Sequence, residues 1–229
     1  MLNDKETEKI RYEKRAVRDL KLKTVLKFGS DSEKNYLRAP YQSYEEKIYQ
    51  LIKPNHKVLE ICSGSGKYTY PLLKTGSTVV ATDISEKSLE LLQKSLSSFK
   101  FKNHLTTKVA DIENLPFHND SFDILTSAGS LSYGSSRVVD KEIFRVLKKG
   151  GYFICVDSLN ENPIYKFNRY VNYLLKRRTK MTLDNMPTIN RINKLKNMYS
   201  NIKVEYFGSI SFLAPVLNLF IGSKRFEKL

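Results

Sequence analysis

The sequence predicts an α/β protein built on a Rossmann-like, doubly wound and mostly parallel sheet with helices on both faces. Short apolar runs at residues 58–61 and 79–83 have the composition of buried strands, and each stops at a turn signal or an acid. Stretches with helical spacing separate the strands, which is the order of βαβ units. With 229 residues, 41% of them hydrophobic, the chain can bury one substantial core.

The N-terminal region, residues 1–45, is predicted to form a helical lid or cap. Residues 5–28 place apolar side chains in a loose helical stripe with a basic far side. A Gly-Ser-Asp-Ser turn follows, and residues 36–44 open the helix that leads to the first strand.

Alternating strands and helices continue through the predicted core. A helix is expected over residues 85–99, with Ser85 as its N-cap and leucines at every third or fourth position. A second helix, over 138–147, is expected to end at Gly150 and to lead into a fifth strand at residues 152–156. Ligands of such a sheet bind at the carboxyl ends of its strands.

Residues 158–203 are predicted to be a helical insertion after strand five. Asn162 and Pro163 start a helix with an apolar stripe, a basic run follows at 176–180, and a second helix begins near Ile189. We expect this insertion to select the acceptor.

The insertion carries much of the net charge of +15, because residues 163–203 contain ten Lys or Arg and one acid, Asp184. Such a surface attracts phosphates, whether of RNA, of anionic lipid headgroups or of a pyrophosphate-linked substrate. A basic face that is merely solvated is the alternative.

The C-terminal part, residues 204–229, is expected to complete the same domain with a sixth strand at 204–207 and an apolar segment. No seventh strand is evident. The longest apolar stretch, 210–221, is broken by Pro215 and is too short to span a bilayer.

The most informative motif runs from Val58 to Gly66. Its glycines allow a sharp turn and close approach of backbone N–H groups to a ligand, and an acid that ends the next strand, Asp83, can accept the hydroxyls of a ribose. A P-loop is excluded by Ile61 and Tyr68, and a nicotinamide fingerprint is disfavoured because Thr69 replaces its third glycine.

With Glu60 inside the strand, this motif resembles motif I of the class I S-adenosylmethionine-dependent methyltransferases, and the resemblance covers residues 56–157. It implies a cofactor-binding core at 46–157 and S-adenosyl-L-methionine as the cofactor. By this resemblance Asp83 grips the ribose, Asp111 receives the adenine amine and Ile112 packs on its ring. The implied cofactor-binding residues are Glu60, Cys62, Ser63, Gly64, Gly66, Asp83, Ile84, Asp111, Ile112, Ser127, Tyr36 and Arg38.

One residue departs from the family pattern. Cys62 stands where motif I usually has its first glycine, and its Cβ and sulfur must fit where the backbone normally passes bare. Reduced cofactor affinity is the expected consequence.

The catalytic residues stay open at this stage, since methyl transfer mostly requires alignment and a base is optional. Tyr133 and Asp157 follow strands four and five and should point toward the cleft, although Asp157 could equally cap the next turn. The three histidines look structural or solvated, and no metal site is expected.

These features predict a methyltransferase that acts on a small-molecule or on a phosphate-bearing, glycan-linked or lipid-linked acceptor, with oxygen favoured as the methylated atom. An RNA methyltransferase, a non-catalytic binding module with this fold and an oxidoreductase are the competing hypotheses. Two cysteines in predicted buried strands and a charged, non-signal N-terminus favour the cytoplasm. Peripheral contact with the inner membrane surface is a further expectation, and the oligomeric state is left open.

Overall fold

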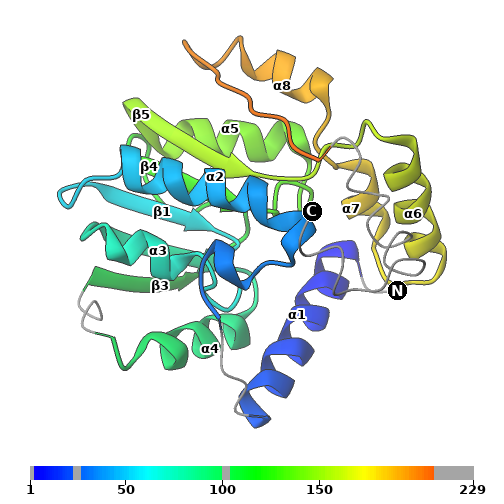
Figure 1. The fold of residues 1–229 in the computed structure, drawn as a ribbon, viewed down its shortest axis with the longest axis horizontal. Coiled ribbons are helices and arrows are strands. Elements are labelled where there is room, and N and C mark those ends of the chain that lie inside the picture. Colours follow the sequence, from blue (N-terminus) through cyan, green and yellow to red (C-terminus); the bar gives the residue numbers. More distant parts are fainter. Residues whose placement is uncertain (1–2, 23–26, 100–103, 209–229) are drawn as a thin grey trace.

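The fold is an α/β sandwich around a parallel sheet, seen in a computed structural model that describes residues 3–22, 27–99 and 104–208 (Figure 1). Among these residues the sheet has five strands in the order β3-β2-β1-β4-β5, and every pairing is parallel. The strands are β1 Lys57–Ile61, β2 Thr78–Asp83, β3 Leu105–Val109, β4 Phe122–Ala128 and β5 Leu147–Val156. The predicted Rossmann-like fold class is thereby confirmed.

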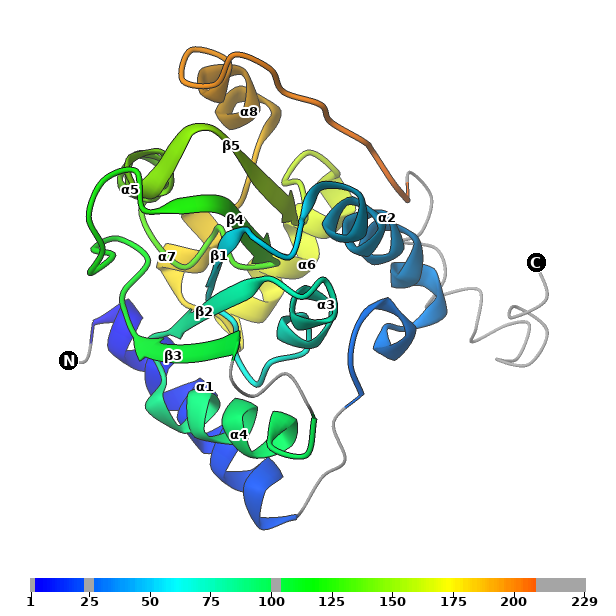
Figure 2. The same cartoon turned by 90° about the vertical axis from the view of Figure 1, so that its left-hand side faces the viewer.

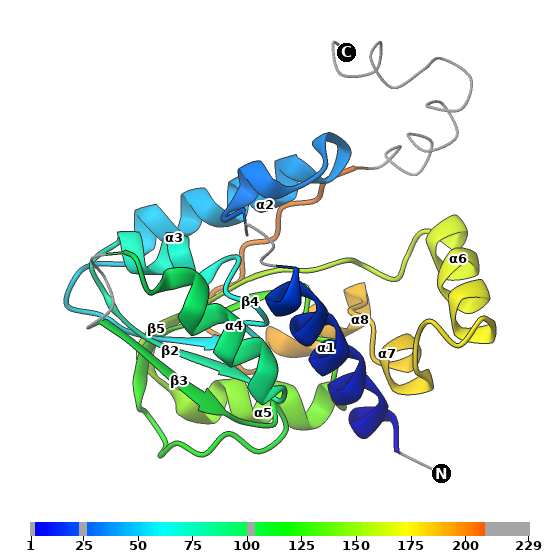
Figure 3. The ribbon, with the colours of Figure 1, turned by 90° about the horizontal axis from the view of Figure 1, so that it is seen from below.

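Helices cover both faces of the sheet (Figure 3). One core cluster joins α2, α3 and α4 to one face, and a second joins α5 to the other, because successive residues of the central strands point to opposite sides. The helices are α1 Asp4–Lys21, α2 Asn35–Leu51, α3 Thr69–Lys74, α4 Glu86–Leu96, α5 Ser136–Val146, α6 Pro163–Leu174, α7 Lys180–Asp184 and α8 Ile189–Leu195, with a 3-10 turn η1 at Ser30–Ser32.

Two predicted helix starts are confirmed by their caps. The Ser85 hydroxyl accepts a hydrogen bond from the backbone N–H of Ser88 at 3.1 Å, which satisfies a free donor in the first turn of α4. The Asn162 side chain does the same for Ile164 at 2.9 Å at the start of α6. These caps fix where α4 and α6 begin.

The N-terminal helix α1 lies beside α4 and reaches α7 at its N-terminal end (Figure 2). The inserted helices divide between two places. Helices α6 and α7 lie beyond the carboxyl ends of the strands, whereas α8 lies against α5, held by an ion pair of 2.6 Å between Arg191 and Asp140 (Figure 1).

The predicted sixth strand at residues 204–207 is wrong. These residues form no strand and lie against α2, where Glu205 accepts a hydrogen bond of 2.5 Å from the Ser43 hydroxyl. β5 is therefore the sheet edge among the described residues, and Cys155 is exposed there rather than buried as predicted. The apolar residues 210–221 lie outside the described residues.

The predicted helix end at Gly150 is also wrong. Helix α5 ends at Val146 and the chain passes directly into β5, so Gly150 lies inside that strand with φ 78°. A Cβ on the next residue, Gly151, would stand 2.6 Å from the carbonyl oxygen of Asp123. This glycine pair serves the irregular start of β5, where the register with β4 shifts.

No helix within the described ranges combines the length and the apolar character needed to cross a membrane.

Candidate functional site

The turn after β1 is built from residues in the left-handed region. Cys62, Gly64 and Gly66 have φ values of 51°, 55° and 88°. The ideal Cβ position of Gly64 has no atom within 4 Å, whereas a Cβ on Gly66 would stand 2.7 Å from the Leu92 side chain. The two glycines therefore differ in purpose, because Gly64 leaves open space for a ligand and Gly66 lets α4 pack against the turn.

The buried Asp83 at the end of β2 holds this turn in place. One carboxylate oxygen accepts the N–H of Gly64 at 2.9 Å, and the other accepts that of Ser85 at 2.8 Å. Burial raises the pKa of Asp83, and the backbone hydrogen bonds oppose this shift. Each oxygen keeps a second lone pair, so the carboxylate can accept two further hydrogen bonds from a ligand.

Glu60 is a second buried acid, within β1. Burial raises its pKa to about 8, opposed by a hydrogen bond of 2.5 Å from the Thr69 hydroxyl and reinforced by the charge of Asp83. Thr69, at the start of α3, thus orients Glu60, a role that the sequence analysis missed. The signal was present, since a hydroxyl residue opens the helix that follows the glycine turn.

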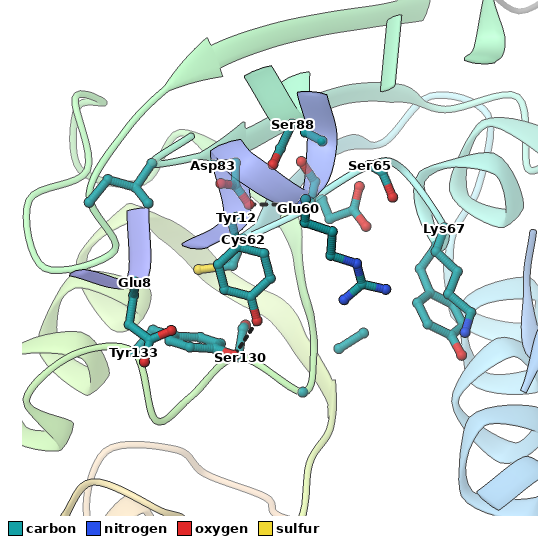
Figure 4. A pocket seen from close by; sticks show the side chains of 18 of the residues that line it. Glu8, Tyr12, Glu60, Cys62, Ser65, Lys67, Asp83, Ser88, Ser130 and Tyr133 are labelled. Atoms are coloured by element: carbon teal, nitrogen blue, oxygen red, sulfur yellow. Dashed lines mark hydrogen bonds between the residues drawn. The ribbon is translucent and has the colours of Figure 1, made fainter. Parts of the chain in front are cut away.

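These residues surround a cavity of about 320 Å³ at the carboxyl ends of β1, β2 and β4 (Figure 4). This volume is at the lower end of the range of small-molecule sites, about 300 to 1,000 Å³. The predicted site residues that line it are Glu60, Cys62, Ser63, Gly64, Asp83, Ile84 and Tyr133.

Helix α1 covers the cavity and supplies residues that the sequence analysis did not name. Tyr12 of α1 meets Tyr133, which follows β4, through a hydroxyl–hydroxyl contact with ring centroids 5.7 Å apart (Figure 4). Lys5 donates to Asp111 at 2.6 Å and also pairs with Glu113. The amphipathic spacing of residues 5–28 indicated a helix that packs on the domain. That spacing does not reveal which surface the helix packs against, so it could not place Tyr12 or Lys5 at the cavity.

The same helix is bound to the insertion at its N-terminal end. Glu8 is buried, pairs with Arg11 at 2.7 Å and accepts a hydrogen bond of 2.9 Å from the Thr179 hydroxyl. The Asp4 carboxylate accepts the backbone N–H of Met181 at 2.6 Å, and Met181 itself lines the cavity. Segments some 170 residues apart in sequence therefore form one wall.

The tyrosine side chains that line the cavity are neutral. Burial raises the pKa of both Tyr12 and Tyr133, and it raises the pKa of Tyr41, which also lines the cavity, to about 12. Tyr12 and Tyr133 can thus donate or accept hydrogen bonds at neutral pH but cannot serve as anionic bases.

Among the described residues, five of the predicted cofactor-binding residues do not line the cavity. Asp111 lies at its margin in the ion pair with Lys5, and Ile112 is buried in the core cluster against α5. The Ser127 hydroxyl is buried and bonded to that of Ser130 at 2.7 Å, and the Arg38 guanidinium donates to the carbonyl of Asp31 at 3.2 Å. Gly66 packs against Leu92 of α4, and the side chain of Tyr36 lies outside the described residues.

Asp157 is not placed as a base. Its carboxylate accepts the N–H of Leu131 at 2.9 Å and that of Ser158 at 2.7 Å, and burial raises its pKa. These bonds fix the loop after β4 against the end of β5. The capping interpretation is the one that the geometry favours, and Asp157 does not line the cavity.

Among the described residues, no cluster of His, Cys, Asp and Glu could hold a metal ion.

Comparisons with known proteins agree with this geometry. A family model described as a methyltransferase domain matches residues 59–155. A demethylmenaquinone methyltransferase of Lactococcus lactis is 33% identical over 118 residues, 48% of this chain and 45% of that protein. The ubiquinone/menaquinone biosynthesis C-methyltransferase UbiE of Geotalea daltonii is 29% identical over 165 residues, 68% of this chain and 64% of that protein.

The chain thus spans less than two thirds of the length of either relative. Among solved structures, the YcgJ protein of Bacillus subtilis superposes with a TM-score of 0.56 at 22% identity, over 69% of this chain and 67% of that one. This likeness shows a shared fold.

The raised pKa of Glu60 predicts a pH-dependent stability. Its folded pKa of about 8 exceeds the ordinary glutamate pKa of 4.5, so the folded state binds the extra proton between these values and loses stability as pH rises through this window. Glu60→Gln removes the titration. Its stability relative to the parent should therefore increase by about 2 to 3 kcal/mol between pH 5.5 and 7.5, measured by urea unfolding.

The exposed Glu46→Gln on α2 is the matched control and should show no such trend. Equal pH profiles for the Glu60→Gln protein and its parent would contradict the burial of a protonated Glu60.

The left-handed backbone of Cys62 predicts the outcome of two substitutions. A side chain at φ 51° costs about 1 to 2 kcal/mol of strain, which Cys62→Gly relieves and Cys62→Ala retains. Glycine also gains freedom in the unfolded state, which costs about 0.5 to 1 kcal/mol. We expect the glycine variant to be at least as stable as the alanine variant in thermal unfolding. A clearly less stable glycine variant would show that the backbone strain is not relieved there.

Proposed function

The chain belongs to the class I S-adenosylmethionine-dependent methyltransferases, and on this basis we propose that it transfers a methyl group from S-adenosylmethionine to a small-molecule acceptor. The observation that carries the proposal is the convergence of Glu60, Gly64 and Asp83 on one cavity at the carboxyl ends of the strands. S-adenosylmethionine supplies a methyl group on a positively charged sulfur, and its transfer needs mainly alignment with the acceptor.

The residues present suit this cofactor. Asp83 keeps lone pairs for two ribose hydroxyls, and the open space at Gly64 admits a ligand close to the backbone. Glu60 lies deeper and would meet the amino-acid end, where an ammonium group favours the ionised carboxylate and lowers its pKa again. Ser63 and Ile84 line the same cavity and would contact the adenosine.

The adenine end is proposed to lie toward Asp111 and Ile112. In the structure one oxygen of Asp111 accepts from Lys5 and the other from the N–H of Glu113. An adenine amine would share this carboxylate with Lys5, because each oxygen has two acceptor positions. The Asp111 carboxylate would then contact both the cofactor and Lys5 of α1.

The acceptor is proposed to enter between α1, the loop after β4 and α7. The neutral hydroxyls of Tyr12 and Tyr133 would hold an acceptor oxygen by hydrogen bonds, and their rings would contact an aromatic acceptor. Met181 adds an adaptable apolar surface to this wall.

We favour carbon of an electron-rich, hydroxylated ring as the methylated atom over the oxygen that the sequence analysis favoured. The two relatives act in menaquinone or ubiquinone synthesis by their names, and one is named as a C-methyltransferase. An electron-rich ring carbon can attack the methyl group before any proton is lost, while the methyl–sulfur bond breaks and S-adenosylhomocysteine leaves. The ring carbon then releases its proton to water, so a cavity whose phenols are neutral suits this reaction. O-methylation of a glycan-linked acceptor lacks a matching observation.

RNA methylation and a non-catalytic role have less support. RNA methylation rests on the net charge of +15 alone. A non-catalytic module was suggested by Cys62, but its side chain leaves the space at Gly64 open. Calorimetry with S-adenosylmethionine tests cofactor binding, mass spectrometry of quinol, glycan and RNA acceptors tests the acceptor class, and NMR of the product locates the methyl group.

Cofactor affinity should depend on Asp83. Asp83→Ala removes the carboxylate that pairs with the ribose, at a cost of about 1 to 3 kcal/mol, or roughly tenfold to a hundredfold in affinity by calorimetry. The fold should also lose some stability, because Gly64 and Ser85 lose their acceptor. Asp31→Ala, on an exposed acid of η1, is the control. Unchanged affinity in the Asp83→Ala protein would refute the ribose assignment.

Tyr133 should act on the acceptor and leave cofactor affinity near that of the parent. Tyr133→Phe keeps the ring and removes one hydrogen bond to an acceptor oxygen, which should lower kcat/KM roughly fivefold at a cost of about 1 kcal/mol. Tyr206→Phe, an exposed tyrosine, is the control. Equal kcat/KM for Tyr133→Phe and the parent would place the acceptor elsewhere in the cavity.

A further inference from the structure

Helix α6 presents its apolar side chains to solvent. Ile164 is 50% exposed, Phe167 is 69% exposed and Leu174 is 60% exposed, and Tyr170 lies beside them with 50% exposure. These positions share one side of a helix, because they recur at three- and four-residue steps. We call this surface the apolar face of α6.

The opposite side of α6 turns a charged residue inward. Arg169 is 9% exposed and donates to the Asn160 side chain at 2.9 Å and to the carbonyl of Leu159 at 3.3 Å. Its guanidinium also lies 5.8 Å from the ring of Tyr165. A surface helix usually buries its apolar side chains and exposes its charged ones, whereas α6 exposes Ile164, Phe167 and Leu174 and buries Arg169.

This reversal has a cost in water that a partner can remove. Burying a large apolar side chain is worth about 1.5 to 3 kcal/mol relative to leaving it exposed, so water does not favour this orientation. Contiguous exposed apolar surface on a folded chain marks an interaction site. Helix α6 stands at the periphery in two perpendicular views, beyond α1 and α7 (Figures 1 and 3).

The charge around the apolar face indicates which partner fits. Lys166 on α6 and Lys176, Arg177 and Lys180 just after it are exposed, and residues 163–183 contain no acid. Basic side chains beside exposed Ile, Phe and Leu are the composition of helices that lie in the headgroup region of anionic membranes. We propose that α6 docks the protein on an anionic lipid bilayer.

The dimensions agree with this mode of binding. Twelve helical residues extend about 18 Å, enough to lie in the plane of the interface and too short to span it. Phe167 and Tyr170 could stack on nucleobases, but Ile164 and Leu174 have no ring, so RNA would leave that part of the apolar face in water, whereas a bilayer would cover all of it.

Docking would also present the cavity to the bilayer. Residues 175–179 connect α6 to α7, where Thr179 bonds Glu8 of α1 and Met181 lines the cavity. A bilayer that fixes α6 therefore lies one short connection from the acceptor wall. This step rests on the proposed function and suits an acceptor that carries a lipid tail, whereas the docking itself requires no catalysis.

The test is flotation of the full chain with phosphatidylcholine vesicles, with and without phosphatidylglycerol. We expect binding to the anionic vesicles, weakened on the order of tenfold or more by Phe167→Ser with Leu174→Ser. Lys176→Gln with Arg177→Gln should also weaken it on the order of tenfold, with the difference shrinking as salt rises. Circular dichroism and calorimetry with S-adenosylmethionine report folding and cofactor binding separately.

Matched controls lie far from α6. Leu22→Ser changes a side chain that is also 69% exposed, at the far end of α1. Lys53→Gln with Lys149→Gln removes two exposed charges near the amino-terminal ends of β1 and β5. Controls and parent should bind vesicles alike.

Several results would overturn the docking proposal. The first is equal vesicle binding by the α6 variants and the parent, and the second is equal binding of the parent to neutral and anionic vesicles. The third is a parent that light scattering shows to be a dimer and a Phe167→Ser, Leu174→Ser protein that is a monomer, because the apolar face would then bind a second copy of the chain. Binding of RNA that depends on Arg177 but not on Phe167, without vesicle binding, would assign the surface to nucleic acid. If neither the parent nor any variant binds S-adenosylmethionine while vesicle binding is intact, the proposed function is refuted and the docking proposal stands.

Discussion

The carboxylate of Asp83 joins the parts of this molecule that must meet for the cavity to exist. Its hydrogen bonds to the N–H groups of Gly64 and Ser85 connect the turn after β1 to the start of α4. The parallel pairing of β1 and β2 brings these segments together at the carboxyl end of the sheet. The Asp83 carboxylate then fixes the distance between them. The open space at Gly64 and the packing of Leu92 beneath Gly66 both depend on that separation.

Two buried acids in an apolar sheet make the cavity favourable for a cation. Burial raises the pKa of both Glu60 and Asp83, and the negative charge of Asp83 further disfavours ionisation of Glu60. A positively charged ligand would stabilise the ionised form of both carboxyls and reduce the repulsion between them. The removal of this unfavourable electrostatic energy of the free protein would contribute to the free energy of binding. Thr69 reduces that cost for Glu60 while fixing its direction.

The remaining wall comes from additions at both ends of the core. Helix α1 reaches Asp111 through Lys5, Tyr133 through Tyr12 and the insertion through Glu8. These contacts are polar, in contrast to the apolar clusters that hold α2 to α5 on the sheet. The core thus supplies the rigid part of the cavity, and the additions supply the part that can differ in acceptor choice.

The sequence by itself determined the succession of strands and helices in the core, the glycine turn and the acids that end or interrupt its strands. These are local signals, because burial on both faces gives continuous apolar runs and a sharp turn requires glycine. The caps Ser85 and Asn162 were readable for the same reason. The start of β5 at Leu147 was not readable, since Gly150 there serves a strand irregularity rather than a helix end.

Only the tertiary structure decided which side chains meet. The contact of Tyr12 with Tyr133 joins residues 121 apart, and that of Glu8 with Thr179 joins residues 171 apart, so no local pattern contains them. The sequence showed an apolar stripe on α6 but not that it faces water, because a helical period gives the relative direction of side chains and not the position of the core. For the same reason Asp157 could be placed at a strand end from its sequence position, while the partners of its carboxylate could not.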